Sequence, residues 1–159
     1  MNVQLFRIDD RLIHGQVVIG WFNFLNSEKV ILCDDSVAQN EWEKELYLSS
    51  VPDNVLAAVL STDEMARQLK TNSIDLSKTI VLVNSPFVIE TLVQKEAAPE
   101  TVNVGGIHYK EGRREFLPYL FLNEQEIASF KKLMDLGIEF YCQDVPSAKP
   151  IPLQKVLSK

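Results

Sequence analysis

Short apolar runs alternate along the chain with longer segments in which apolar residues recur at helical spacing. The runs are four to six residues long, which fits buried strands, and they cover residues 3–8, 29–33, 56–60, 79–83, 101–104 and 138–142. A repeated strand-then-helix order is typical of an α/β fold with a mostly parallel sheet and helices on both of its faces.

Several segments between the runs carry helix signals. Ser61 with Glu64 and Asn123 with Glu126 match the capping pattern at a helix start, and Gly137 stands where the second of these helices should end. Residues 153–157 predict a short final helix. One face of a helix is predicted by the i, i+1, i+4, i+5, i+8 spacing of Val17, Val18, Trp21, Phe22 and Leu25.

A further apolar run, residues 116–122, follows residues 101–104 without an intervening helix pattern. The connection between them, GGIHYKEGRRE, is polar and contains glycine, so an antiparallel neighbour is expected there. With this run the sheet has about seven strands, open and mostly parallel. Neither an internal repeat nor a linker composition divides the chain, and a single domain over residues 1–159 is expected.

Composition and charge narrow the class of protein. The 159 residues are 46% hydrophobic and 24% charged, which is ordinary for a soluble globular protein with a core. The 16 basic and 22 acidic residues give a net charge of −6, which argues against binding to nucleic acid or to anionic membranes. Neither a secretory signal nor the ~18–20 residue apolar stretch of a membrane span is visible. Two separated cysteines in apolar runs fit a cytoplasmic protein.

The segment RIDDRLIHGQ, residues 7–16, concentrates reactive side chains directly between the first strand and the first helix. A helix N-terminus favours anions, so His14 is placed where a phosphoryl group could be held, with Gly15 and Gln16 supplying backbone amides. Arg11 can donate to the same oxygens. Alternatively, Arg11 pairs with a neighbouring acid and braces the loop.

Other residues could line this site, because parallel sheets bind ligands at the carboxyl ends of their strands. Asp9 and Asp10 end the first strand and favour a proton on the nearby imidazole, whereas Arg11 disfavours it. Asp35, Gly105 and Gly106 also follow strands; for Asp35 and its neighbour Asp34, a helix-capping pair is the stronger interpretation. His108, without carboxylate neighbours in sequence, is expected to be a surface residue rather than a metal ligand.

The string RIDDRLIHGQV, followed by Trp21, resembles the signature of the enzyme IIB component of the bacterial phosphotransferase system, mannose/fructose/sorbose family. The resemblance covers nearly the whole chain and includes CDD with VA after the second strand, Pro52, NVGG with Arg113-Arg114, and GI leading to QDVP near the C-terminus.

This resemblance implies a phosphocarrier that needs no cofactor or metal. His14 would accept a phosphoryl group from a IIA component and pass it to a sugar held by the membrane components IIC and IID. Arg11 would contact the phosphate. The chain would sit at the inner face of the cell membrane through these partners, with no span of its own. Mannose, fructose, sorbose and N-acetylgalactosamine all remain open as the sugar.

Two functions from other classes stay as alternatives. A receiver-type regulatory domain would bind Mg²⁺ with the acidic pair Asp9 and Asp10, but the third strand ends Val59-Leu60-Ser61, without an aspartate to accept phosphate. A non-catalytic sensor or scaffold for a small ligand is the second alternative. It does not explain why a histidine followed by glycine stands at a helix start.

Overall fold

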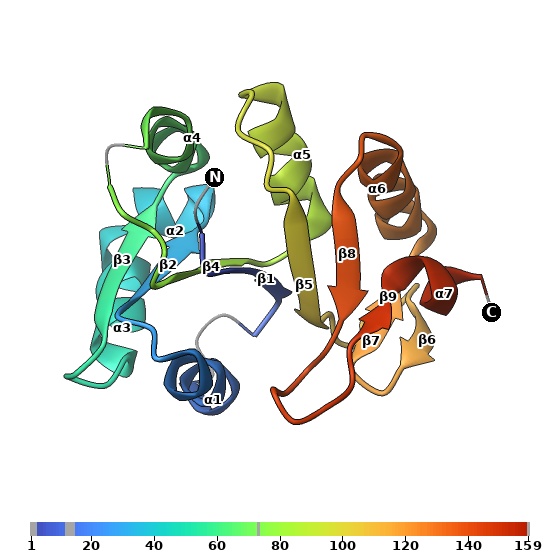
Figure 1. Ribbon diagram of the computed structural model, residues 1–159, viewed down its shortest axis with the longest axis horizontal. Helices are drawn as coiled ribbons and strands as arrows, with labels where there is room; N and C mark the ends of the chain where they lie inside the picture. Colours follow the sequence, from blue (N-terminus) through green and yellow to red (C-terminus); the bar gives the residue numbers. More distant parts are fainter. Residues whose placement is uncertain (1–2, 12–14, 73, 159) are drawn as a thin grey trace.

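The core of the molecule is a seven-stranded sheet. The structure is a computed structural model, which describes residues 3–11, 15–72 and 74–158. The strand order is β3-β2-β4-β1-β5-β8-β9, and all neighbours pair in parallel except β8 and β9 (Figure 1). The strands are β1 (Leu5–Asp9), β2 (Lys29–Cys33), β3 (Leu56–Leu60), β4 (Thr79–Val83), β5 (Thr101–Gly106), β8 (Glu139–Cys142) and β9 (Ile151–Pro152).

Helices cover both faces of this sheet and bury a separate apolar core on each (Figure 1). On one face, α1 (Gly15–Leu25) and α3 (Glu41–Ser50) pack against β2, β3 and β4, with α2 (Asp35–Gln39) at the edge of this core. On the other face lie α4 (Thr62–Thr71), α5 (Pro86–Gln94), α6 (Glu124–Asp135) and α7 (Leu153–Leu157). The predicted α/β fold with helices on both faces is therefore confirmed.

The alternation of side chains along β1 assigns its residues to the two faces. Phe6 and Ile8 belong to the core under α4, α5 and α6, whereas Leu5 belongs to the core under α1. Arg7 therefore faces the α1 side, where its guanidinium lies 5.4 Å from the ring centroid of Trp21. A fully buried arginine thus occupies a position that an apolar residue fills elsewhere in the strand.

The strands at residues 29–33, 56–60 and 79–83 have the predicted bounds, while β1 and β5 reach Asp9 and Gly106. Both predicted capping boxes form, at Ser61 and at Asn123. Gly137 follows α6 with φ of +99°, a conformation that glycine adopts without steric cost. Local sequence signals therefore fixed most element boundaries.

The prediction for residues 116–122 is wrong. The run is not one strand but two, β6 (Arg114–Leu117) and β7 (Leu120–Leu122), which form their own antiparallel pair. Pro118 lacks a backbone N–H and fixes φ, so the chain turns there instead of continuing a strand. A parallel bridge joins Leu120 to Ile107, the residue directly after β5, and β9 is the seventh strand of the sheet.

Candidate functional site

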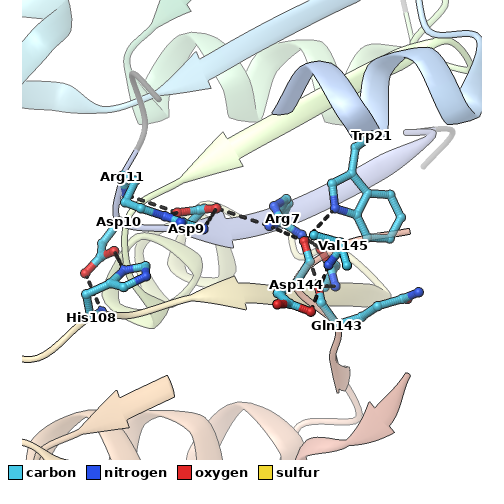
Figure 2. Close-up of polar contacts among 10 residues, drawn as sticks. Arg7, Asp9, Asp10, Arg11, Trp21, His108, Gln143, Asp144 and Val145 are labelled. Atoms are coloured by element: carbon cyan, nitrogen blue, oxygen red, sulfur yellow. Dashed lines mark hydrogen bonds and ion pairs between the residues drawn. The ribbon is translucent and has the colours of Figure 1, made fainter. Parts of the chain in front are cut away.

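Arg7 is the centre of a buried polar cluster at the carboxyl end of β1 (Figure 2). Its Nη1 donates to Asn103 Oδ1 at 2.5 Å and to the Gln143 carbonyl at 3.1 Å. Its Nη2 donates to Asp9 Oδ2 at 3.1 Å and to the Asp144 carbonyl at 3.0 Å. Burial lowers the pKa of Arg7, and the charge of Asp9 opposes that shift. The cluster ties β1, β5 and the segment after β8 together.

The backbone of β5 makes room for this arginine. The register shifts from Ile8 beside Val104 to Asp9 beside Gly106, so Gly105 is an additional residue in a bulge. A Cβ atom on Gly105 would overlap the Arg7 guanidinium. The close approach therefore requires glycine at this position.

Asp9 links the buried arginine to a second, more exposed one. The Asp9 carboxylate accepts from Arg11 Nε at 3.2 Å, from Arg11 Nη2 at 3.3 Å and from the Arg11 backbone N–H at 3.0 Å. The Arg11 side chain is 32% exposed, against 3% for Asp9. The bracing contact expected as an alternative for Arg11 is thus present, and its contact with phosphate stays a prediction.

Asp10 points to the opposite side of the β1–α1 connection from Asp9 (Figure 2). Its carboxylate accepts from the His108 backbone N–H at 2.8 Å and lies 2.6 Å from His108 Nδ1. The two residues are 98 positions apart in sequence and meet at this edge of the sheet, so no local spacing indicated the contact. The imidazole remains 37% exposed.

The structure brings together Asp9, Asp10, Arg11, Gly105 and Gly106 among the predicted site residues. Gly106 lies beside this group: a Cβ there would stand 2.8 Å from His108 Cε1 and 3.4 Å from Arg11 Nη2. Gly105 instead leaves room for the Arg7 guanidinium.

His14, the predicted phosphoryl acceptor, lies outside the described residues. Gly15 and Gln16 open helix α1, as the sequence indicated, and the contacts of their amides with phosphate stay predictions.

Asp35 contacts the start of α4 rather than the cluster around Asp9. Its carboxylate accepts from the Thr62 backbone N–H at 2.7 Å and from the Thr62 hydroxyl at 3.1 Å, at the start of α4. Asp34 caps α2 by accepting from the Val37 backbone N–H at 2.9 Å. The helix-capping interpretation is confirmed for Asp34, whereas Asp35 holds the first residue of α4, whose cap is Ser61. The site-lining role of Asp35 stays a prediction.

Sequence reasoning missed Arg7, Asn103 and Gln143 as parts of the site. Arg7 and Asn103 are paired neighbours on β1 and β5, and each is fully buried. The available signal was a charged or amide side chain within an otherwise apolar strand run, which burial makes costly unless it is partnered. The identity of the partners follows only from the strand order.

The arrangement suits an anion rather than a metal ion. Two guanidinium groups and the start of an eleven-residue helix, α1, lie at one edge of the sheet. Asp9 pairs with Arg7 and Arg11, whereas Asp10 contacts His108 and lies 3.7 Å from Arg113 Nη1, so the two acids do not form a shared acidic pocket. Among the described residues, no group of three or more His, Cys, Asp or Glu side chains is arranged to hold a metal ion.

Comparison with known proteins identifies the class. Residues 3–159 match the family model described as the sorbose subfamily IIB component of the PTS system, the sugar phosphotransferase system. The chain is 34% identical over 147 residues to the fructose-specific EIIB component of Bacillus subtilis strain 168, covering 92% of this chain and 90% of that one. It is also 31% identical to the mannose-specific EIIAB component of Escherichia coli K12, covering all of this chain but only 49% of that longer protein.

The fold comparison agrees. The IIB domain of the sorbose permease from Klebsiella pneumoniae superimposes with a TM-score of 0.87 at 27% identity, over 99% of this chain and 97% of that one. The protein is therefore a phosphotransferase-system component. It belongs to the IIB components of the mannose/fructose/sorbose family, which take part in sugar transport as phosphotransferases. Within the described part of the chain, no helix is both long and apolar enough to cross a bilayer.

Proposed function

We propose that this chain is a phosphocarrier that accepts a phosphoryl group on His14 from a phosphorylated IIA component and passes it to a sugar. The observation that carries the proposal is the position of the RIDDRLIHGQV motif. His14 immediately precedes Gly15, where α1 begins, and it follows the buried Arg7–Asp9 pair at the carboxyl end of the central strand β1.

The residues around the motif supply what a transient phosphohistidine needs. The phosphoryl group on His14 carries about two negative charges, which the amides of the first turn of α1 and the Arg11 guanidinium can stabilise. Asp9 fixes the orientation of Arg11 through Nε and Nη2, and a guanidinium carries more N–H groups than these contacts use. Because Asp9 also offsets part of the positive charge, the phosphoryl group is held without being trapped.

The phosphoryl group moves in two transfers, first to His14 and then to the sugar. In the first, the lone pair of a neutral His14 nitrogen forms a bond to phosphorus, and the bond to the donor histidine nitrogen breaks with its electron pair left on that nitrogen. The other ring nitrogen of His14 gives up its proton, and the donor imidazole takes up one, so both histidines end neutral. In the second, a sugar hydroxyl oxygen bonds to phosphorus, the His14 nitrogen recovers its lone pair, and the proton released by the hydroxyl restores the neutral imidazole. Neither step needs an oxidant, a metal ion or a cofactor.

The proposal includes partners and a place of action. The phosphoryl donor is a IIA component, and the acceptor sugar is presented by the membrane components IIC and IID at the cytoplasmic face of the membrane. Relatives named for fructose, mannose and sorbose match over most of this chain, and no observation on the site separates these sugars.

The test is reconstitution with radiolabelled phosphoenolpyruvate, enzyme I, HPr and candidate IIA proteins. An acid-labile label is expected on the peptide that contains His14, and His14→Ala is expected to fold normally and remain unlabelled. The chain has two histidines, so a label retained by His14→Ala would move the assignment to His108. Failure of the wild-type chain to take label from every IIA protein would instead favour a non-catalytic sensor.

A further inference from the structure

We infer that His108 is a positioning residue for phosphoryl transfer, acting through Asp10 on the connection between β1 and α1. The inference rests on the proposed function, because it assigns His108 to the reaction of His14. His108 does not belong to the segment that carries the motif, and it reaches that segment only through the fold.

Three hydrogen bonds join Asp10 to the end of β5 and the segment after it, and the Arg113 guanidinium adds an ion pair, with Nη1 3.7 Å from Asp10 Oδ2. The Asp10 backbone N–H donates to the Gly106 carbonyl at 3.0 Å, and the carboxylate accepts from the His108 backbone N–H at 2.8 Å. The third contact is the 2.6 Å approach of His108 Nδ1 to Asp10 Oδ1 (Figure 2). This last contact is the only one of the three that depends on the side chain of residue 108, so substitution can remove it alone.

The segment that presents His108 is itself anchored to the rigid part of the fold. The Arg113 guanidinium donates to the His108 carbonyl at 2.7 Å and pairs with Glu126 at 3.0 and 2.6 Å. Glu126 is almost fully buried and completes the capping box of α6 with Asn123. His108 therefore connects Asp10 to a segment that is anchored to α6.

Gly106 shows that the imidazole and the Arg11 guanidinium share one small space. The side of Gly106 on which a Cβ would stand faces His108 Cε1, Arg11 Nη2 and Asp9 Oδ1. The buried Asp9 carboxylate contacts Arg11, and the partly exposed His108 imidazole contacts Asp10 from a different direction (Figure 2). The two consecutive acids are thus fixed in different directions immediately before the chain continues to His14.

Positioning matters here because transfer requires the acceptor nitrogen in line with the donor's phosphorus–nitrogen bond. A small displacement of a catalytic group can cost as much as about a hundredfold in rate. Loss of the imidazole contact alone, with the two other hydrogen bonds and the Arg113 ion pair of Asp10 retained, should displace the connection only partly. We therefore expect a decrease of about tenfold in the rate of phosphoryl transfer, which corresponds to ~1.4 kcal/mol.

The experiment measures single-turnover transfer from phosphorylated IIA to His14 as a function of IIA concentration. His108→Ala should lower the maximal rate about tenfold and leave the half-saturating IIA concentration unchanged. His108→Asn should restore most of the rate, since its amide N–H can stand where imidazole Nδ1–H stands. His108→Gln, whose amide reaches the position of Nε2 instead, should stay as slow as His108→Ala. Tyr109→Ala is the matched control and should transfer at the wild-type rate. It removes the neighbouring side chain, whose ring packs against Phe121 and takes no part in the hydrogen bond to Asp10.

A double-mutant cycle tests the route through Asp10. If His108 acts by holding Asp10, adding His108→Ala to Asp10→Asn should slow transfer no further than Asp10→Asn alone. Additive effects, rescue by Gln as well as by Asn, or a change confined to half-saturation would overturn the inference. So would a folded His108→Ala variant that transfers at the wild-type rate. Absence of any label on His14 in the wild-type chain would refute the proposed function, a different outcome from each of these.

Discussion

Arg7 and Asp9 stand two residues apart on β1 and form an ion pair of 3.1 Å, with the Arg7 side chain fully buried and that of Asp9 3% exposed. Both side chains face α1, because residues i and i+2 of a strand share a face. Asp9 is also the acceptor for Arg11, so one carboxylate supports the buried and the exposed guanidinium at once. The first prediction follows from this dependence.

Asp9→Ala should destabilise the fold strongly, because it leaves the buried Arg7 charge without its carboxylate. Removing one partner of a buried ion pair typically costs about 3–5 kcal/mol. The measurement is the free energy of unfolding in urea. Asp63→Ala is the control, since the Lys95–Asp63 pair is exposed and its loss should change stability little. Equal stability of the two variants would contradict the structural role of Asp9.

Two glycines give a matched test of the close approach at Arg7. Gly105→Ala places a methyl group on the Arg7 guanidinium and should prevent the native packing of β1 against β5. Gly20→Ala, on an exposed position of α1 with no atom within 4 Å of the new methyl group, should stabilise the protein by about 0.5–1 kcal/mol. Thermal melting of both variants checks the prediction, and a Gly105→Ala protein as stable as wild type would refute it.

Arg11→Gln separates the two roles of that arginine. A hydrogen bond from a charged donor is worth ~1.5–3 kcal/mol, so loss of a phosphate contact should slow transfer very roughly ten- to a hundredfold. Lys at this position should restore only part of the rate, because an ammonium lacks the planar pair of donors. Loss of the Asp9 brace alone predicts a lower melting temperature with transfer nearly intact. The measurements are the transfer rate and the melting temperature of Arg11→Gln, with Arg67→Gln, a remote and exposed position, as the control. They decide whether Arg11 contacts phosphate or only braces the loop.

The two cysteines should be inert in the native protein. Cys33 and Cys142 are fully buried, and burial raises the pKa of each thiol to about 12. Each thiol therefore stays protonated at pH 8, and the thiolate is the reactive form. A thiol reagent at pH 8 should detect neither cysteine until denaturant is added, and both afterwards. Because the folded state holds these protons more tightly, the thiols contribute stability that is lost as pH rises toward 12.

The local elements and the chemistry-bearing segment were predictable from sequence because their causes are local. A run of buried apolar residues, a capping box such as Ser61 with Glu64, or a glycine after a helix acts over a few positions. The motif around His14 was equally visible, since it lies in one stretch between a strand and a helix. The error at residues 116–122 also has a local cause, because the turn at Pro118 was read as part of a strand.

The environment of that segment was decided only by the tertiary structure. The strand order places β5 beside β1, so Asn103 and Gly105 meet Arg7, and the return of the chain after β5 brings His108 to Asp10. These pairs are separated by about a hundred residues, and no periodicity or capping rule relates such positions. A buried charge in a strand shows that partners must exist, because an unpaired charge is too costly to bury. Only packing of the whole sheet determines which residues those partners are.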